Sequence, residues 1–214
     1  MFRLPASLHR WYARPLVCAM LIFGQALPTV ATEGGWVAVL RDIEQSVVRL
    51  TVTRPEGPGS CSVTVVENGL GLTAAHCVTY DDAFYAVNGK PAWVEKVDRA
   101  RDIALLRIHA KGLKALRFAR ESPKMGEEAA IVGYAMGSVQ LFAQAGIVAN
   151  PLELNDQQLI LAVEVMPGDS GGAALNTKGE LVGLVVAGWL APPAQLACAV
   201  PIEAVREFVK GYVR

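Results

Sequence analysis

The strongest indication of this chain's fold is a glycine-rich stretch, Gly168-Asp169-Ser170-Gly171-Gly172. Glycines let a backbone turn tightly and let a ligand approach it closely. Such a turn exposes Ser170, and the amides of Gly168 and Ser170 can then point together at a developing negative charge. Taken alone, the stretch fits a nucleophile and a plain turn between two strands equally well, because short Gly/Ser patterns recur by chance.

Two segments upstream carry the other residue types that a nucleophilic serine needs. Thr73-Ala74-Ala75-His76-Cys77 places an imidazole after a strand-like run, and Asp102-Ile103-Ala104-Leu105-Leu106 places a carboxylate before an apolar strand. Each segment alone fits an ordinary structural His or a surface Asp. A serine hydrolase requires a base for the hydroxyl proton and a carboxylate to orient that base. Together, the three segments predict a catalytic triad of His76, Asp102 and Ser170.

In their order, TAAHC, DIALL and GDSGG resemble the signature motifs of the chymotrypsin-like serine peptidases. The resemblance implies that His76 is the general base, Asp102 its orienting carboxylate and Ser170 the nucleophile. It also assigns the oxyanion donors to the amides of Gly168 and Ser170. Further motifs are similar to the bacterial Deg, or high-temperature-requirement, branch: Gly126-Glu127, Val132-Gly133-Tyr134, Ala145-Gly146-Ile147-Val148 and Ala199-Val200-Pro201-Ile202.

Short runs of β-branched and apolar residues, separated by Gly, Pro, Asn and Asp, predict many short strands. Their ranges are 47–53, 62–66, 70–73, 83–87, 92–97, 103–108, 129–133, 139–148, 159–165, 181–186 and 196–200. A short helix is predicted at 37–45 and an amphipathic helix at 201–213. Strands without alternating long helices favour an antiparallel β-fold. The resemblance implies an all-β, double antiparallel β-barrel of the chymotrypsin type with a C-terminal α-helix. We expect the trypsin-like protease domain at 32–214, with its barrels at 36–115 and 116–200.

Other hydrolase folds fit the chain order less well. The stretch around Ser170 also matches G-x-S-x-G of α/β-hydrolases, but in that fold the His follows the Ser, and no His follows Ser170. A subtilisin order would need Asp42 before His76, in a chain that lacks strand–helix alternation. Two other readings stay open, a catalytically idle or latent binding module of the same fold and an esterase that uses the same triad.

Two departures from the resembling families stand out. The Deg branch usually carries Asn where this chain has Asp169, and it usually carries PDZ domains after the protease, which we do not expect in this chain. We therefore do not carry over PDZ regulation or the family's large oligomers, and the oligomeric state is not predicted. The digestive enzymes pair this acid with a new N-terminus, but no activation site is found near the start. We expect Asp169, if buried and ionised, to be bound by an Arg or by backbone amides.

The first residues have the composition of an export signal. Arg3, Arg10 and Arg14 precede the apolar run 16–23, and Thr29-Val30-Ala31 ends the segment with small residues. This pattern predicts a signal peptide at 1–31 and a periplasmic or secreted protein, with a membrane anchor only if the signal is not cleaved. Twenty basic and twenty acidic residues leave no net charge, so the composition predicts no nucleic-acid or anionic-membrane partner.

The cysteines support the same reading. The resemblance implies a disulfide between Cys61 and Cys77 that pins the histidine loop, and two free buried thiols are the alternative. Export to an oxidising compartment favours the bridge. Cys198 is then unpaired and is expected to be a buried thiol. No metal or organic cofactor is predicted, because few His or Cys ligands remain and the triad needs none.

Polypeptides are the expected substrates. By resemblance, Val186, Ala187 and Gly188 should pair with the substrate backbone as an added β-strand. Glu164, six residues before Ser170, falls near the base of the S1 pocket in relatives, and a buried carboxylate there would favour Lys or Arg at P1. An exposed Glu164 on a strand face, with Met166 and Cys198 lining an apolar pocket, is the alternative.

Overall fold

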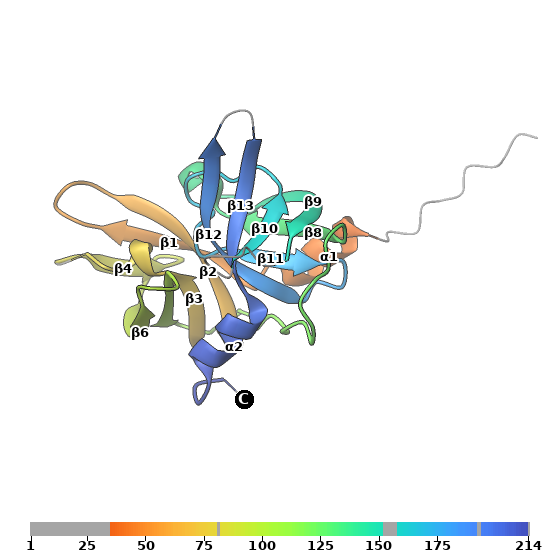
Figure 1. The fold of residues 1–214 in the computed structure, drawn as a ribbon. Helices are drawn as coiled ribbons and strands as arrows, with labels where there is room; N and C mark the ends of the chain where they lie inside the picture. The colour runs from red at the N-terminus through yellow and green to blue at the C-terminus, as the bar shows by residue number, and fades with distance from the viewer. Residues whose placement is uncertain (1–34, 81, 152–157, 192–193, 214) are drawn as a thin grey trace, which may run out of the picture. The chain divides into compact units, whose positions relative to one another are not determined.

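A computed structural model describes residues 35–80, 82–151, 158–191 and 194–213 (Figure 1). The predicted signal peptide at 1–31 lies outside the described residues. Within the described ranges, no helix is both long and apolar enough to cross a membrane.

The first sheet contains seven antiparallel strands from the first half of the chain. Their order in space is β5-β4-β1-β2-β3-β7-β6, so β2 and β3 lie near its centre. The strands are β1 (Val47–Thr53), β2 (Gly59–Glu67), β3 (Leu70–Ala74), β4 (Phe84–Val87), β5 (Lys90–Pro91), β6 (Trp93–Asp98) and β7 (Ile103–Arg107). β-Branched residues and alternating burial in β1, with Val48, Leu50 and Val52 inward, place one face of this sheet in the core.

The second sheet closes into a barrel in the order β10-β13-β12-β11-β8-β9. Its strands are β8 (Glu128–Gly133), β9 (Phe142–Asn150), β10 (Leu159–Ala162), β11 (Ala173–Asn176), β12 (Leu181–Ala191) and β13 (Ala194–Pro201). β12 and β13 form a long hairpin, which Figure 1 shows as two blue strands. Two helices flank the sheets, α1 (Trp36–Ile43) and α2 (Ile202–Val209). The expected all-β fold of two barrel-like sheets with a C-terminal helix is confirmed.

Several element boundaries differ from the sequence prediction. Strand β11 was not predicted, because its run of Ala173–Asn176 is short and poor in β-branched residues. The C-terminal helix ends at Val209 instead of 213, because Lys210 leaves the helical conformation and Gly211 follows with φ of +88°. Pro201 stands in the extended conformation at the end of β13, so it caps the helix rather than forming its first turn.

The polar residues buried in β2 and β3 orient the two sheets toward the glycine turn. Ser62, Thr64 and Thr73 are almost completely buried, although they lie in an otherwise apolar core. Buried hydroxyls need hydrogen-bond partners. Thr73 donates to the carbonyl of Ser62 inside the first sheet, while Thr64 donates to the carbonyl of Gly171. These contacts join the first sheet to the turn that carries Ser170.

Candidate active site

His76 lies at the end of a buried strand and faces a carboxylate. The chain leaves β3 at Ala74 and forms a single 3₁₀ turn, Ala75–Cys77 (η1), which carries the imidazole. The Nδ1 atom of His76 lies 2.7 Å from Oδ2 of Asp102, and the His76 amide donates to Oδ1 at 2.8 Å. Both carboxylate oxygens therefore act on the same residue. This arrangement fixes the tautomer with the proton on Nδ1 and leaves Nε2 free to accept one.

The backbone of Asp102 is held in an unusual conformation. Its φ is +55°, in the left-handed region that Asp tolerates better than most residues. The Asp102 carbonyl accepts a hydrogen bond from the Ala75 amide at 3.1 Å, just before β7 begins. Three hydrogen bonds thus join Asp102 to the turn of His76, which places the carboxylate beside the ring.

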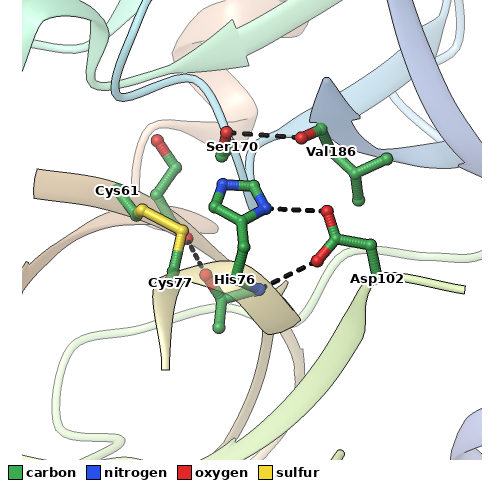
Figure 2. Close-up of polar contacts among 8 residues, drawn as sticks. Cys61, His76, Cys77, Asp102, Ser170 and Val186 are labelled. Carbon is green, nitrogen blue, oxygen red and sulfur yellow. Dashed lines mark hydrogen bonds and ion pairs between the residues drawn. A yellow bond between two sulfur atoms is a disulfide. The ribbon is translucent and has the colours of Figure 1, made fainter. Parts of the chain in front are cut away.

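Ser170 lies next to the His76 ring, on the side away from the His76 Cβ. The Nε2 atom of His76 faces Ser170 there (Figure 2). The Ser170 hydroxyl donates to the carbonyl of Val186 at 3.5 Å. Among the residues that the structure describes, no hydrogen bond joins this hydroxyl to His76. The three predicted residues are thus brought together from η1, the turn before β7 and the turn before β11.

The glycine turn is bound to the first sheet through Ser62. The Ser62 amide donates to the carbonyl of Ser170 at 2.8 Å, and the Ser62 hydroxyl donates to the carbonyl of Gly168 at 2.8 Å. The same hydroxyl accepts from the amide of Tyr134 at 2.8 Å. Sequence reasoning missed Ser62 and Thr64. The signal available was a pair of hydroxyls at alternate positions in the apolar strand β2.

None of the three glycines of the turn has room for a side chain, and Gly168 and Gly171 show two reasons for this. A Cβ on Gly168 would meet the carbonyl of Tyr134, and a Cβ on Gly171 would meet the carbonyl of Ser62. Both residues also have positive φ, +103° and +85°. The glycines therefore serve close backbone packing as well as the bend.

Hydrogen bonds to the neighbouring carbonyls set the directions of the Gly168 and Ser170 amides. The carbonyl of Pro167, in the same peptide plane as the Gly168 amide, accepts from the amide of Met136. The carbonyl of Asp169, in the same plane as the Ser170 amide, accepts from Gly172 at 2.7 Å. Because N–H and C=O point in opposite directions across a trans peptide, each bond sets the direction of the neighbouring N–H. Within the described ranges neither N–H has an acceptor.

A β-bulge shapes the strand beside Ser170. The pairing of β12 with β13 shifts register between Val185 and Ala187, so Val186 lies in the bulge. Its carbonyl is available to Ser170. Val186 is buried, Ala187 is exposed and Gly188 is half-buried. Bulges of this kind re-aim backbone groups next to functional sites. The role of the three residues in substrate binding stays a prediction.

The structure contains the expected disulfide between Cys61 and Cys77, which closes a separation of 16 residues. It joins β2 to the turn of His76. Cys198 is free of disulfide bonds and buried. Cys61, Cys77 and His76 are also the group of described His, Cys, Asp and Glu side chains close enough to share a metal ion. Because both sulfurs are bonded to each other, neither is available as a thiolate ligand.

Asp169 is 2% exposed and accepts a hydrogen bond from the Met166 amide at 2.8 Å. Of the two expected kinds of partner, the backbone amide is the one present. Burial raises the pKa of Asp169 above its usual value, and the Met166 hydrogen bond lowers it by less.

The carboxylate of Glu164 is exposed, so a buried acid at this position is not present. The predicted strand 159–165 ends at Ala162, so Glu164 lies in the loop that follows β10, where its side chain is exposed while that of Val163 is buried. The neighbour of Gly188 is apolar: a Cβ at Gly188 would meet the side chain of Val165.

Known proteins resemble this chain in sequence and in fold. Residues 59–184 match a family model described as a trypsin-like peptidase domain. Among curated proteins, the chain is 32% identical over 170 residues to the serine protease HTRA1 of Xenopus laevis, covering 72% of this chain and 36% of that protein. It is 27% identical over 177 residues to the mitochondrial serine protease HTRA2 of Drosophila persimilis, covering 74% and 39%. The chain thus spans less than half the length of these relatives.

A solved structure has the same fold at low sequence identity. The serine endoprotease from Yersinia pestis superposes with a TM-score of 0.71 at 22% identity, covering 80% of this chain and 64% of that one.

Proposed function

Because this chain belongs to the trypsin-like peptidase family, whose model matches residues 59–184, we propose that it is a serine endopeptidase acting through His76, Asp102 and Ser170. The observation that carries the proposal is the 2.7 Å contact between Nδ1 of His76 and Oδ2 of Asp102, on a ring whose Nε2 faces Ser170 (Figure 2).

The proposed reaction has two balanced halves. Rotation about the Cα–Cβ bond takes the Ser170 hydroxyl from the Val186 carbonyl to Nε2 of His76, which accepts its proton as Oγ bonds to the peptide carbonyl carbon. The oxyanion is stabilised by the amides of Gly168 and Ser170. His76 then gives its proton to the leaving amine, the C–N bond breaks and an acyl-enzyme remains. In the second half, His76 takes a proton from water as the water oxygen bonds to the acyl carbon. His76 then returns the proton to Ser170 Oγ as the ester bond breaks, which releases the acid product.

Asp102 stabilises this cycle electrostatically. It holds the His76 ring in the tautomer that can accept a proton at Nε2, and its charge favours the imidazolium that forms. Neither step uses a metal or an organic cofactor. We further propose that the substrates are polypeptides, that Val186, Ala187 and Gly188 align them, and that the protein is exported after removal of residues 1–31.

The test is covalent labelling of the chain lacking residues 1–31 with a fluorophosphonate, followed by mass spectrometry. We expect one adduct, on Ser170, which Ser170→Ala abolishes. Asp102→Asn should slow labelling by about 10³- to 10⁴-fold, because it leaves His76 in the wrong tautomer. An Asp42→Asn variant, which alters an exposed carboxylate far from this pair in sequence, is the matched control and should label at the wild-type rate.

Failure to label Ser170 in a folded protein would contradict the proposal and favour the idle or latent binding module. Labelling without cleavage of denatured protein substrates, but with turnover of small esters, would favour the esterase.

A further inference from the structure

An open groove of about 470 Å³ begins beside the turn that carries Gly168. One wall comes from β1 and β2 and the other from the loops after β8 and β10. Its lining includes Arg49, Thr51, Ser60, Met136, Gly137 and Pro167. Pro167 directly precedes Gly168, and Ser60 directly precedes Cys61 of the disulfide. The groove therefore adjoins the catalytic centre.

The position of the groove indicates which part of a bound substrate would lie in it. Figure 2 shows the disulfide on one side of the His76 ring and both Asp102 and Val186 on the other. This inference rests on the proposed function. In that function, the substrate segment before the scissile bond pairs with Val186 and its neighbours. The segment after the scissile bond must then leave over the disulfide, toward Ser60.

The groove has a positive charge at its wall. Among the residues that line the groove, Arg49 is the charged one, and its guanidinium is positive. Within the described ranges no carboxylate forms an ion pair with Arg49. Burial raises the pKa of Tyr134, the Arg49 guanidinium lowers it by less, and Glu44 raises it slightly. Glu44, which also acts on the Tyr134 pKa, is exposed and does not line the groove.

A second, independent feature points to a ligand. The hydroxyl of Ser60 is buried, yet it has no hydrogen-bond partner in the described part of the chain. Ser60 lines the groove and is paired in register with Thr51 on β1. A buried hydroxyl without a partner is costly, so a site that supplies an acceptor is favoured.

We propose that this groove binds a carboxylate that follows the scissile bond of the substrate. A guanidinium recognises a carboxylate through two parallel N–H donors, and a Ser hydroxyl can donate a third bond. Arg49 would supply the two parallel donors, and the buried Ser60 hydroxyl would supply the third after rotation about its Cα–Cβ bond. The carboxylate comes either from a Glu or Asp side chain or from the substrate's C-terminus.

The first experiment measures cleavage specificity. A peptide library from a digested proteome is treated with wild type, Arg49→Glu and Arg120→Glu, and the cleaved bonds are identified by mass spectrometry. Wild type should enrich Glu and Asp about threefold to tenfold at one position after the cleaved bond. Arg49→Glu should replace this with enrichment of Lys and Arg. Arg120→Glu has the same charge change in a different groove and should behave as wild type.

The second experiment does not depend on catalysis, so failure of the proposed function leaves it informative. Ser170→Ala protein is titrated with the amidated tripeptides Ala-Glu-Ala and Ala-Gln-Ala and with Ala-Ala-Ala bearing a free C-terminus, while NMR follows the Arg49 side-chain N–H and the Thr51 amide. We expect shifts with a carboxylate-bearing peptide that are at least about threefold larger than with the Gln peptide. Arg49→Gln should abolish the difference.

The three peptides identify the source of the carboxylate. A preference for the Glu peptide assigns a side chain, and a preference for the free C-terminus assigns the chain end. Equal shifts with all three peptides, or an acidic preference that survives in folded Arg49→Glu and Arg49→Gln, would overturn the proposal.

Discussion

At the residue scale, the unusual group is Asp169, a carboxylate buried next to the nucleophile. It has one hydrogen bond, from the Met166 amide, and no cation forms an ion pair with it among the described residues. A buried charge with so little compensation destabilises the folded state. The sequence indicated that this acid departs from the resembling Deg branch, which carries Asn. The structure adds that the side chain is buried, so the departure has an energetic consequence.

We expect Asp169→Asn to raise the melting temperature at neutral pH by about 2–4 °C. Because burial raises the folded-state pKa above the ordinary 3.8, the wild-type carboxyl favours folding below that value. This contribution is lost as pH rises through the raised pKa, whereas Asn does not titrate. Melting curves from about pH 4 to about pH 8 should therefore show an increasing gap between variant and wild type.

The control for this prediction is Asp42→Asn, a change at an exposed acid in α1, which should shift the melting temperature little at any pH. A constant gap between Asp169→Asn and wild type at all pH values would show that the effect is packing rather than ionisation.

At the element scale, a single 3₁₀ turn carries the candidate base. The turn Ala75–Cys77 follows β3 and ends at a cysteine of the disulfide, and the amides of Ala75 and His76 donate to Asp102, the residue before β7. A turn of three residues has little stability of its own. Its conformation therefore depends on the bonds at both of its ends, of which the disulfide is the covalent one.

Removing the disulfide with Cys61→Ala and Cys77→Ala should lower the free energy of unfolding by about 3 kcal/mol, because the bridge closes a loop of 16 residues. Urea titrations of both proteins measure this. The fluorophosphonate labelling rate of Ser170 should fall as well, since His76 directly precedes Cys77. Dithiothreitol serves as the control, as it should destabilise wild type and leave the double variant unchanged. An unaltered labelling rate would mean that the hydrogen bonds to Asp102 alone hold the turn.

At the scale of the whole molecule, the site is divided between the two sheets. The first sheet carries His76 and Asp102, and the turn before β11 of the second carries Ser170. The contacts through Ser62 and Thr64 join the glycine turn to the first sheet, and no apolar contact could substitute for their directionality. The relative position of base and nucleophile therefore depends on a small set of buried polar bonds.

Ser62→Ala should lower the free energy of unfolding by about 1–3 kcal/mol, because it leaves the carbonyl of Gly168 and the amide of Tyr134 unpaired in a buried region. Labelling of Ser170 should slow more than this stability loss explains, since the Gly168 peptide is no longer held. Measurements are made well below the melting temperature, so that both proteins are folded.

Thr64→Val is the matched comparison, because it removes one hydroxyl bond, to Gly171, and preserves side-chain volume. It should destabilise the fold with a smaller effect on labelling. Equal slowing in both variants would contradict a specific role for Ser62.

The β-rich class, the C-terminal helix and the candidates His76, Asp102 and Ser170 could all be predicted from the amino-acid sequence. Hydrophobic period and turn residues are local signals, and the three motifs are contiguous, so both can be read along the chain. Helix and strand ends, such as Val209 and the short β11, were less well predicted because tertiary packing overrides weak local preference.

Which groups contact one another became known only from the three-dimensional fold. It placed Ser62 beside the glycine turn, Asp169 in the interior with no ion pair among the described residues, Glu164 in an exposed loop, and Arg49 with Ser60 along one groove. Each of these facts depends on contacts between residues far apart in the chain. Their burial and hydrogen bonding follow from how the two sheets pack, which no local pattern of residues specifies.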